Sequence, residues 1–411
     1  MNANLFIAKT LWSGLSGDKG FSGSSSGIAG ASIAISLIVM ILSVSISDGF
    51  KREIRAKASG FSGELILHSP GEDVTTTLYP VNSNSDFVAK IEHLKGVEAV
   101  FPFAYRSGIV KHGEEIQGVM VKGVGEEFDW HFFRSALVEG SIPVLGDTSA
   151  TAGIIISARL AKMLGYAVGD RVLLYFIDNS VRARNFILTG IYSAQLEDID
   201  KTLVVTDIKI VQQLNGWKEY EASGLEVRVS ERADIETLAE EIEATIMDSE
   251  DDAMFVTKID ELFPHLFDWL KLLDFNVLFI LVLMLAVAGF NMVSGLLILT
   301  FEKISMIGLL KALGMRNSDV HKIFMLRALK IVFTGLVVGN LTGIMLASLQ
   351  SRFGVVGLDP ANYFVDTVPI YMDWLKITLL NICTVLVITL VLYIPSAFIS
   401  NVSPEKSLRF K

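Results

Sequence analysis

Four long apolar stretches constrain the fold of this 411-residue chain more than any other feature of its sequence. They begin near Gly27, Phe275, Ala328 and Ile377, and none carries a charged residue in its middle. An α-helix needs about 20 apolar residues to cross the hydrocarbon core of a bilayer, and each stretch reaches that length. The sequence therefore predicts a polytopic α-helical membrane protein with four transmembrane helices.

The composition excludes several other classes of protein. Hydrophobic residues make up 51% of the chain and charged residues only 19%, whereas about a quarter of a soluble domain is charged. A disordered or collagen-like chain is excluded on the same grounds. The single cysteine, Cys383, excludes a disulfide framework, a cysteine-rich metal site and a redox pair.

Charge is distributed unevenly along the chain. Residues 48–271 contain 37 acidic and 22 basic side chains, whereas the remainder contains 8 acidic and 13 basic ones. This division predicts one large acidic, water-facing domain between the first and second spans, and a mildly basic membrane part. It argues against nucleic acid as a partner.

The orientation follows from the basic residues close to the spans. A cleaved signal peptide is the alternative for the first stretch, but this apolar run starts after residue 26 and is longer than a usual signal. Four spans place both termini on one side. The basic loop around 300–327 predicts that this side is the cytoplasm, whereas the cluster KREIRAK at 51–57 argues against that orientation.

The predicted organisation alternates membrane and water-facing segments. The water-facing segments are a cytoplasmic N-terminal segment (1–26), an external α/β domain (48–272), a cytoplasmic loop (301–327), a short external loop (351–375) and a cytoplasmic tail (400–411). The transmembrane helices are expected at 27–47, 273–300, 328–350 and 376–399.

The external domain is expected to be mixed α/β. The segments GELILHS, SDFVAKIEHL and VEAVFPF follow a strand, helix, strand pattern, and GLEVRVS, ADIETLAEEIEATI and AMFVTKI repeat it. Two such units separated by a long segment predict one α/β lobe that is split by an insertion. The insertion contains several further strand patterns, so it is interpreted as a smaller β-rich lobe.

Neither a catalytic nor a metal site is predicted. His112 and His131 lie near several acidic residues, but no metal-ligand spacing supports a site there, and acidic runs in an exposed domain are usually solvated surface. The Gly-rich segment GDKGFSGSSSG at 17–27 lacks the Gly-Lys-Ser/Thr ending of a phosphate-binding loop. We therefore expect this chain to bind no cofactor.

The loop after the second span predicts a short amphipathic helix. Ile304, Ile307, Leu310 and Leu313 recur every three residues, and Gly314 follows as a residue that can end a helix in the left-handed conformation. Such a helix beside a membrane could serve as an interfacial anchor alone.

Several stretches together resemble one family of membrane proteins. The sequence NMVSGLLILTFEKISMIGLLKALGMRNSDVHKIF is similar to the coupling segment of ABC-type permeases of the mechanotransmission kind, which include FtsX, MacB and LolC/LolE. The stretches ILSVSISDGFKREI, ISARLAKMLGYAVGDRVLL, LTGIYSAQLEDIDKTLVVTDI, GLDPANYFVDTVPI and SPEKSLRF resemble LolC/LolE in particular. On these motifs the chain is identified as a member of the LolC/LolE family of lipoprotein-releasing ABC transporter permeases. The Gly/Ser-rich run before the first span departs from the pattern.

The resemblance implies a fold, a location and partners. The external domain would be a MacB-like periplasmic core domain, and the chain a multi-pass protein of the bacterial inner membrane with both termini in the cytoplasm. The implied partners are a cytoplasmic ABC ATPase subunit, which would bind ATP and Mg, a second permease subunit, identical or related, the lipoprotein, a periplasmic lipoprotein carrier and membrane lipid.

The resemblance also implies roles for individual residues. The ATPase would dock on the helix at 302–314, and helical stalks at about 47–58 and 260–275 would move the periplasmic domain. The residues expected to carry this coupling are Glu302, Lys303, Ile307, Leu310, Lys311, Leu313 and Gly314.

A lipoprotein would enter between the first and second spans. The side chains expected to line that site are Ile35, Val39, Met40, Leu42, Met284, Val287 and Met292. The small residues Gly27, Gly30 and Ala31, or Gly335, Gly339 and Gly343, are expected to form close helix contacts instead.

Two alternatives share the same architecture. A MacB-like efflux permease would carry a different cargo, although this chain lacks the nucleotide-binding domain that is fused to the permease in that branch. An FtsX-like scaffold would use ATPase motion to regulate a cell-wall hydrolase.

Overall fold

The computed structural model describes residues 21–69, 79–146, 152–177, 181–230, 233–247 and 254–400, with the side chains of 21–26, 197–198, 361 and 394–400 left out. Most of the expected N-terminal segment and nearly all of the C-terminal tail therefore lie outside the described residues. The chain divides into two compact units. A helical unit comprises Met1–Arg52, Trp269–Gly357 and Thr367–Lys411, and an extramembrane unit comprises Glu53–Asp268 and Leu358–Asp366.

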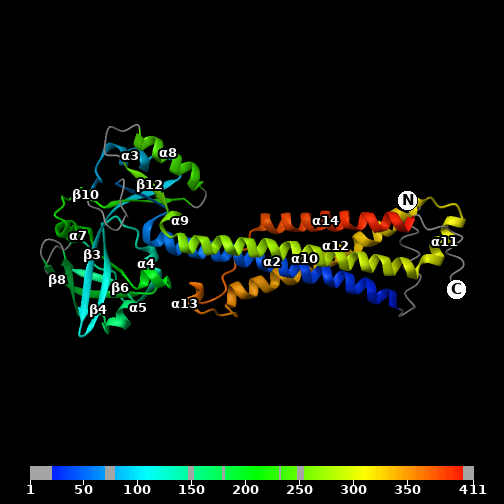
Figure 1. The fold of residues 1–411 in the computed structure, drawn as a ribbon, viewed down its shortest axis with the longest axis horizontal. Helices are drawn as coiled ribbons and strands as arrows, with labels where there is room; N and C mark the ends of the chain where they lie inside the picture. The colour runs from blue at the N-terminus through cyan, green and yellow to red at the C-terminus, as the bar shows by residue number, and fades with distance from the viewer. Residues whose placement is uncertain are drawn as a thin grey trace. The chain divides into compact units, whose positions relative to one another are not determined.

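Four long helices contain the spans, as the sequence predicts (Figure 1). They are α2 (Phe21–Ser62), α10 (Pro264–Glu302), α12 (Asn317–Phe353) and α14 (Trp374–Ser400), and each includes a segment that is long and apolar enough to cross a membrane. At 1.5 Å per residue, the 42 residues of α2 extend for about 63 Å, roughly twice the hydrocarbon thickness. Both α2 and α10 therefore continue beyond the bilayer without a break.

Close packing within the helical unit depends on glycines of α12. A Cβ atom built on Gly335 would lie 2.9 Å from the Ile33 side chain, and one on Gly339 would lie 3.0 Å from Leu37. Larger residues would therefore force α12 away from α2. The expectation of close helix contacts is confirmed at Gly335 and Gly339, whereas no described atom lies within 4 Å of a Cβ atom built on Gly27. Small residues of this kind let membrane helices pack tightly.

Amide side chains join the spans inside the apolar unit. Asn340 of α12 and Asn381 of α14 exchange two hydrogen bonds of 2.7 and 2.9 Å. Asn291 of α10 donates to the hydroxyl of Ser32 in α2 over 2.6 Å. Because water is scarce in hydrocarbon, each such pair satisfies groups that would otherwise be costly, and it fixes the register of the two helices.

The first two cations of the basic cluster after the first span are engaged within the helical unit. Lys51 forms an ion pair with Asp274 at the start of the second span, and the guanidinium of Arg52 lies 4.6 Å from the centre of the Tyr371 ring. One turn earlier, Asp48 pairs with Lys376 over 2.6 Å. These contacts supply a structural reason for the cations that the positive-inside rule leaves unexplained.

The extramembrane unit is built on one mixed sheet. Its strand order is β12-β1-β11-β3-β4-β9-β6-β8-β5, and β7 pairs with β3 and β8. These strands are β1 (Leu65–His68), β3 (Val97–His112), β4 (Glu115–Val124), β5 (Leu137–Gly140), β6 (Gly153–Ser157), β7 (Arg171–Ile177), β8 (Val181–Tyr192), β9 (Leu203–Asp207), β11 (Gly224–Val229) and β12 (Phe255–Lys258). A small second sheet pairs β2 (Val81–Asn82) with β10 (Glu221–Ala222).

The two repeated strand, helix, strand units lie together, as predicted. β1, α3 (Asp86–Glu92) and β3 form the first, and β11, α8 (Ile235–Met247) and β12 form the second. Their four strands are neighbours in the sheet, and the apolar faces of α3 and α8 share one buried cluster. Figure 1 shows these two helices side by side.

The insertion is rich in strands, and it shares one sheet with the α/β part. β3 has 16 residues, and its first part pairs with β11 while its second part pairs with β4 and β7. One long strand therefore carries the sheet from the α/β part into the insertion. The further helices of this unit are α4 (His131–Ala136), α5 (Ala158–Leu164), α6 (Glu197–Asp200), α7 (Ile208–Asn215) and α9 (Ile259–Leu262).

A buried ion pair lies where the end of α2 meets this sheet. Lys122 of β4 is fully buried and pairs with Glu226 of β11, and it also donates to the backbone carbonyl of Phe61. Burial raises the pKa of the Glu226 carboxyl and lowers the pKa of the Lys122 ammonium, and the ion pair opposes both shifts. The pair therefore stabilises the unit only while both partners are present.

Lys122→Met is expected to destabilise the extramembrane unit by about 3–5 kcal/mol, because it leaves the Glu226 carboxylate buried without a counter-charge. The double variant Lys122→Met/Glu226→Leu should recover much of that loss. Thermal unfolding of the full chain in detergent, followed by tryptophan fluorescence, measures both. A double variant that is as unstable as the single one would contradict this account.

Candidate functional site

The predicted coupling helix is present between the second and third spans. α10 ends at Glu302, α11 occupies Ile304–Ala312, and α12 starts at Asn317. Gly314 adopts the left-handed conformation with φ 93°, and its N–H donates to the carbonyl of Lys311. The helix therefore ends where the sequence indicates, by a conformation that glycine adopts without strain.

The apolar stripe of this helix is divided between two faces. Ile307 is 1% exposed and belongs to the same buried cluster as Leu299 and Phe324, whereas Leu313 is 77% exposed. Residues spaced by three drift by about 60° per step around a helix, so Ile307 and Leu313 cannot share one face. Leu309, which the sequence analysis missed, is 55% exposed on the side away from the core.

The remaining predicted coupling residues surround this exposed face. Glu302 is exposed, and Lys303, Leu310 and Lys311 are half-buried. The structure thus brings the predicted residues together on one short segment, but it assigns Ile307 to internal packing. Leu309 could have been found from the sequence, because it is an apolar residue on the helix face opposite the buried one.

The residues expected to line a lipoprotein site differ in their burial. Met40 and Met292 are buried in the core of the helical unit. Ile35 and Val287 are exposed on the outside of their helices. Val39, Leu42 and Met284 are half-buried.

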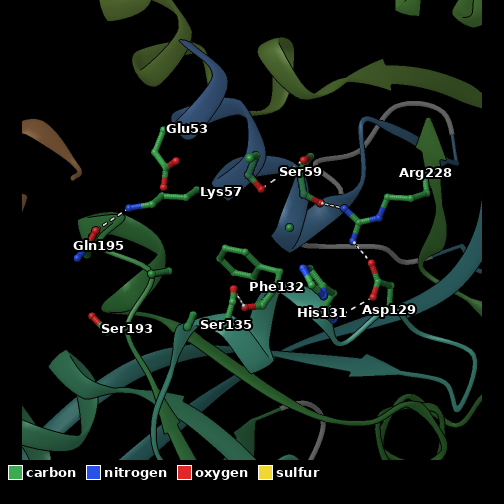
Figure 2. A pocket seen from close by; sticks show the side chains of 14 residues that line it. Glu53, Lys57, Ser59, Asp129, His131, Phe132, Ser135, Ser193, Gln195 and Arg228 are labelled. Atoms are coloured by element: carbon green, nitrogen blue, oxygen red, sulfur yellow. Dashed lines mark hydrogen bonds and ion pairs between the residues drawn. The ribbon is translucent and has the colours of Figure 1, made fainter. Parts of the chain in front are cut away.

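A pocket of about 530 Å³ lies in the extramembrane unit, against the last turns of α2 (Figure 2). Phe132 and Gly60 give it an apolar wall, and its rim is polar and carries both signs of charge. Its lining side chains include Glu53, Lys57, Ser59, Asp129, His131, Phe132, Ser135, Ser193, Gln195 and Arg228.

Cations at one end of the pocket cap helix α2. Arg228 donates to the carbonyl of Ser59 over 2.9 Å, and its other terminal nitrogen lies 3.7 Å from the carboxylate of Asp129. Figure 2 shows Arg228 between these two groups. Lys122 bonds the carbonyl of Phe61 in the same turn. Cations bonded to the last carbonyls of a helix interact favourably with its dipole, so they fix the end of α2 to the sheet.

Lys57 and Gln195 lie at the other end of the pocket. The ammonium of Lys57 donates to the side-chain oxygen of Gln195 over 2.6 Å. The backbone N–H of Gln195 donates to the carboxylate of Asp200 over 2.9 Å. Burial raises the pKa of Asp200 to about 6, although hydrogen bonds from the backbone of Gln195 and Ala194 oppose the shift.

Among the residues that the structure describes, no three His, Cys, Asp or Glu side chains gather as a metal site would require. His112 stacks on Tyr166 and bonds the carbonyl of Leu164, and His131 lies on the pocket rim. Both histidines therefore have contacts that involve no metal.

Comparisons with known proteins place the two halves of the chain in described families. The family described as MacB-like periplasmic core domain matches residues 26–245, more than half of the chain. The family described as FtsX-like permease C-terminal matches residues 278–404. The first match covers the first span and most of the extramembrane unit, and the second covers the other three spans.

Curated relatives extend over almost the whole length. The lipoprotein-releasing system transmembrane protein LolC of Neisseria meningitidis serogroup B is 25% identical, over 93% of each chain. LolE of Haemophilus influenzae is 20% identical over 92% of each. The macrolide export ATP-binding/permease protein MacB 1/2 of Paracoccus denitrificans is 24% identical over 77% of this chain and 47% of its own. Among solved structures, the periplasmic region of MacB from Actinobacillus actinomycetemcomitans covers 50% of this chain and 94% of that one, with 14% identity and a TM-score of 0.34.

Asp200→Asn is expected to change the pH dependence of stability. Because the folded pKa of Asp200 is raised, the neutral carboxyl favours the folded state at low pH, and that contribution is lost as the pH rises through about 6. The variant should therefore gain stability relative to the native chain between about pH 4 and pH 7. Unfolding midpoints of both proteins across this range give the difference curve, and a flat curve would contradict the assignment.

Proposed function

We propose that this chain, which belongs to the MacB-like periplasmic core domain family and carries an FtsX-like permease C-terminal domain, is the permease subunit of an ABC transporter that releases lipoproteins from the inner membrane. The observation that carries the proposal is the similarity to LolC over 93% of both chains. The lipoproteins would pass to the outer membrane through a periplasmic carrier.

In this proposal a separate cytoplasmic ATPase, which binds ATP and Mg, docks on the segment around α11. Leu309 and Leu313 offer exposed apolar side chains, and Glu302, Lys303 and Lys311 surround them with charge. An apolar centre with a polar rim is the usual composition of a protein interface. Leu310 and Gly314 shape the same face, whereas Ile307 supports it from within.

Movement of the ATPase would reach the periplasmic unit through the helices themselves. α10 runs from Pro264 to the coupling segment without a break, and α2 continues past the first span to Ser62. A hydrogen-bonded helix transmits displacement along its axis because each peptide group is bonded to the next turn. The capped end of α2 at Arg228 and Lys122 would pass that displacement to the sheet.

The lipid anchor explains why such work is needed. Each methylene of a buried acyl chain contributes about 0.8 kcal/mol, so one chain of about 16 carbons represents roughly 12 kcal/mol of membrane anchoring. A sheltered apolar route avoids exposing that surface to water. The exposed side chains of Ile35 and Val287 are available to such a route on the membrane face, together with the half-buried Val39, Leu42 and Met284.

A second permease subunit, identical or related, would complete the transporter in the inner membrane, with both termini in the cytoplasm. An efflux permease is the second candidate, because a macrolide exporter is 24% identical over 77% of this chain. This chain aligns with only 47% of that relative, however, whereas its similarity to LolC extends over 93% of both chains. We therefore favour lipoprotein release.

Depletion of this chain should strand outer-membrane lipoproteins in the inner membrane. Fractionation of the two membranes, followed by detection of a lipoprotein labelled with palmitate, measures the outcome. Efflux of a macrolide measured in the same cells tests the alternative. Normal lipoprotein sorting after depletion, in cells without a second such permease, would refute the cargo assignment.

Leu313→Asp should weaken the complex with the ATPase by about tenfold or more, because it places a charge in the apolar centre of the interface. Met247→Asp, at an 85% exposed apolar residue of the extramembrane unit, is the matched control and should leave the complex intact. Co-purification of the ATPase with each variant measures the effect. Equal recovery with both variants would exclude Leu313 from the interface.

A further inference from the structure

The loop between the third and fourth spans belongs to the extramembrane unit in part. The chain leaves α12 at Phe353 and enters α14 at Trp374, yet Leu358–Asp366 cluster with the extramembrane residues. The loop closes on itself, because the N–H of Leu358 donates to the carbonyl of Asp366 over 2.7 Å. Its tip carries the short helix α13 (Pro360–Tyr363). A connection between two spans is thus held by a different part of the molecule.

Two hydrogen-bonding side chains hold the tip of this loop. The ammonium of Lys57 in α2 donates to the backbone carbonyl of Phe364 over 2.8 Å and to the side-chain oxygen of Gln195 over 2.6 Å. The amide nitrogen of Gln195 donates in turn to the carboxylate of Asp366. Lys57, Gln195 and the loop therefore form a closed set of polar contacts, which we call the clamp.

Apolar packing supports the same contact. Val365 is buried, and the Phe364 side chain packs against the buried cluster that contains Tyr192 and Leu196. The loop is therefore seated on the unit by its side chains as well as by the clamp. Packing alone would resist separation but would not fix the position of the backbone.

Backbone strain marks this contact as one that the fold maintains at a cost. Among the described residues, Gln195 and Phe364 are the two non-glycine residues with positive φ, at 63° and 62°. Each is in a left-handed conformation that is unfavourable for a residue with a side chain. Strained residues persist only where the surroundings determine them, and they cluster at clamps and switch regions. Here both are in direct contact with Lys57.

We propose that Lys57 is a positioning residue, which with Gln195 clamps the loop at 358–366 onto the extramembrane unit, so that this loop and the ends of the spans it joins follow the movement of that unit during lipoprotein release. The inference rests on the proposed function for its cargo. It adds a second mechanical connection, through the third and fourth spans, to the one that α2 and α10 provide. The clamp itself is a property of this chain alone and can be tested without any cargo.

The first experiment measures hydrogen exchange in the purified complex with its ATPase, reconstituted in lipid nanodiscs. Lys57→Met should speed exchange of the amides in 358–366 by about tenfold or more, because it removes the two clamp hydrogen bonds that the Lys57 ammonium donates. Lys57→Arg, which keeps the charge and the donors, should keep the protection. Arg55→Met is the matched control, because Arg55 lies in the same cluster and contacts the Phe267 ring instead of the loop.

The second experiment measures transfer of a palmitate-labelled lipoprotein from the same nanodiscs to a soluble carrier. Lys57→Met should reduce transfer at least fivefold while ATP hydrolysis without cargo stays within about twofold of the native rate, and Lys57→Arg should restore transfer. If Lys57→Met fails to assemble, Asp366→Ala, which removes only the bond from Gln195, takes its place. The proposal would be overturned if Lys57→Met left hydrogen exchange of 358–366 at the native rate. It would also be overturned if that exchange became faster while lipoprotein transfer stayed at the native rate. A native complex that transfers no lipoprotein would refute the cargo assignment and leave the exchange result to decide on the clamp.

Discussion

The hydrogen bonding of the backbone in hydrocarbon is the constraint on which the rest of this structure depends. A span must satisfy its polar groups within its own helix, because the bilayer offers no water to do so. In α2 and α10 this internal bonding continues past the apolar stretch, because each is one unbroken helix. The end of such a helix needs other hydrogen-bond donors, because its last backbone carbonyls lack partners within the helix.

The structure satisfies that free end with cations from the sheet. Arg228 bonds the carbonyl of Ser59 and Lys122 bonds that of Phe61, while Glu226 balances the buried ammonium of Lys122. These few side chains thereby connect the end of α2 to strands β4 and β11. The adjacent pocket is the space that remains beside this joint, and Lys57 closes its other side. The mechanical role proposed for the chain needs such a joint, because displacement of a helix is useful only where its end is held.

The sequence predicted features that depend on residues close together in the chain, and it missed those that depend on residues far apart. Hydrophobic length located four spans, and helical periodicity located α11 and its end at Gly314, because both signals are local. The motifs predicted the family over almost the whole chain. The sequence did not show that the β-rich insertion shares one sheet with the α/β part, since nothing local reveals that β3 is long enough to pair in both.

The sequence by itself determined that this chain spans a membrane four times, that an acidic α/β domain follows the first span, and that a short capped helix joins the second span to the third. Only the tertiary structure decided which residues of that helix face outward, Ile307 being internal and Leu309 external, and what the cluster after the first span is for. The physical reason is that a side chain's partner lies far away in sequence: Lys51 meets Asp274, and Lys57 meets Gln195 and Phe364. Periodicity reveals a face, but only packing reveals what covers it.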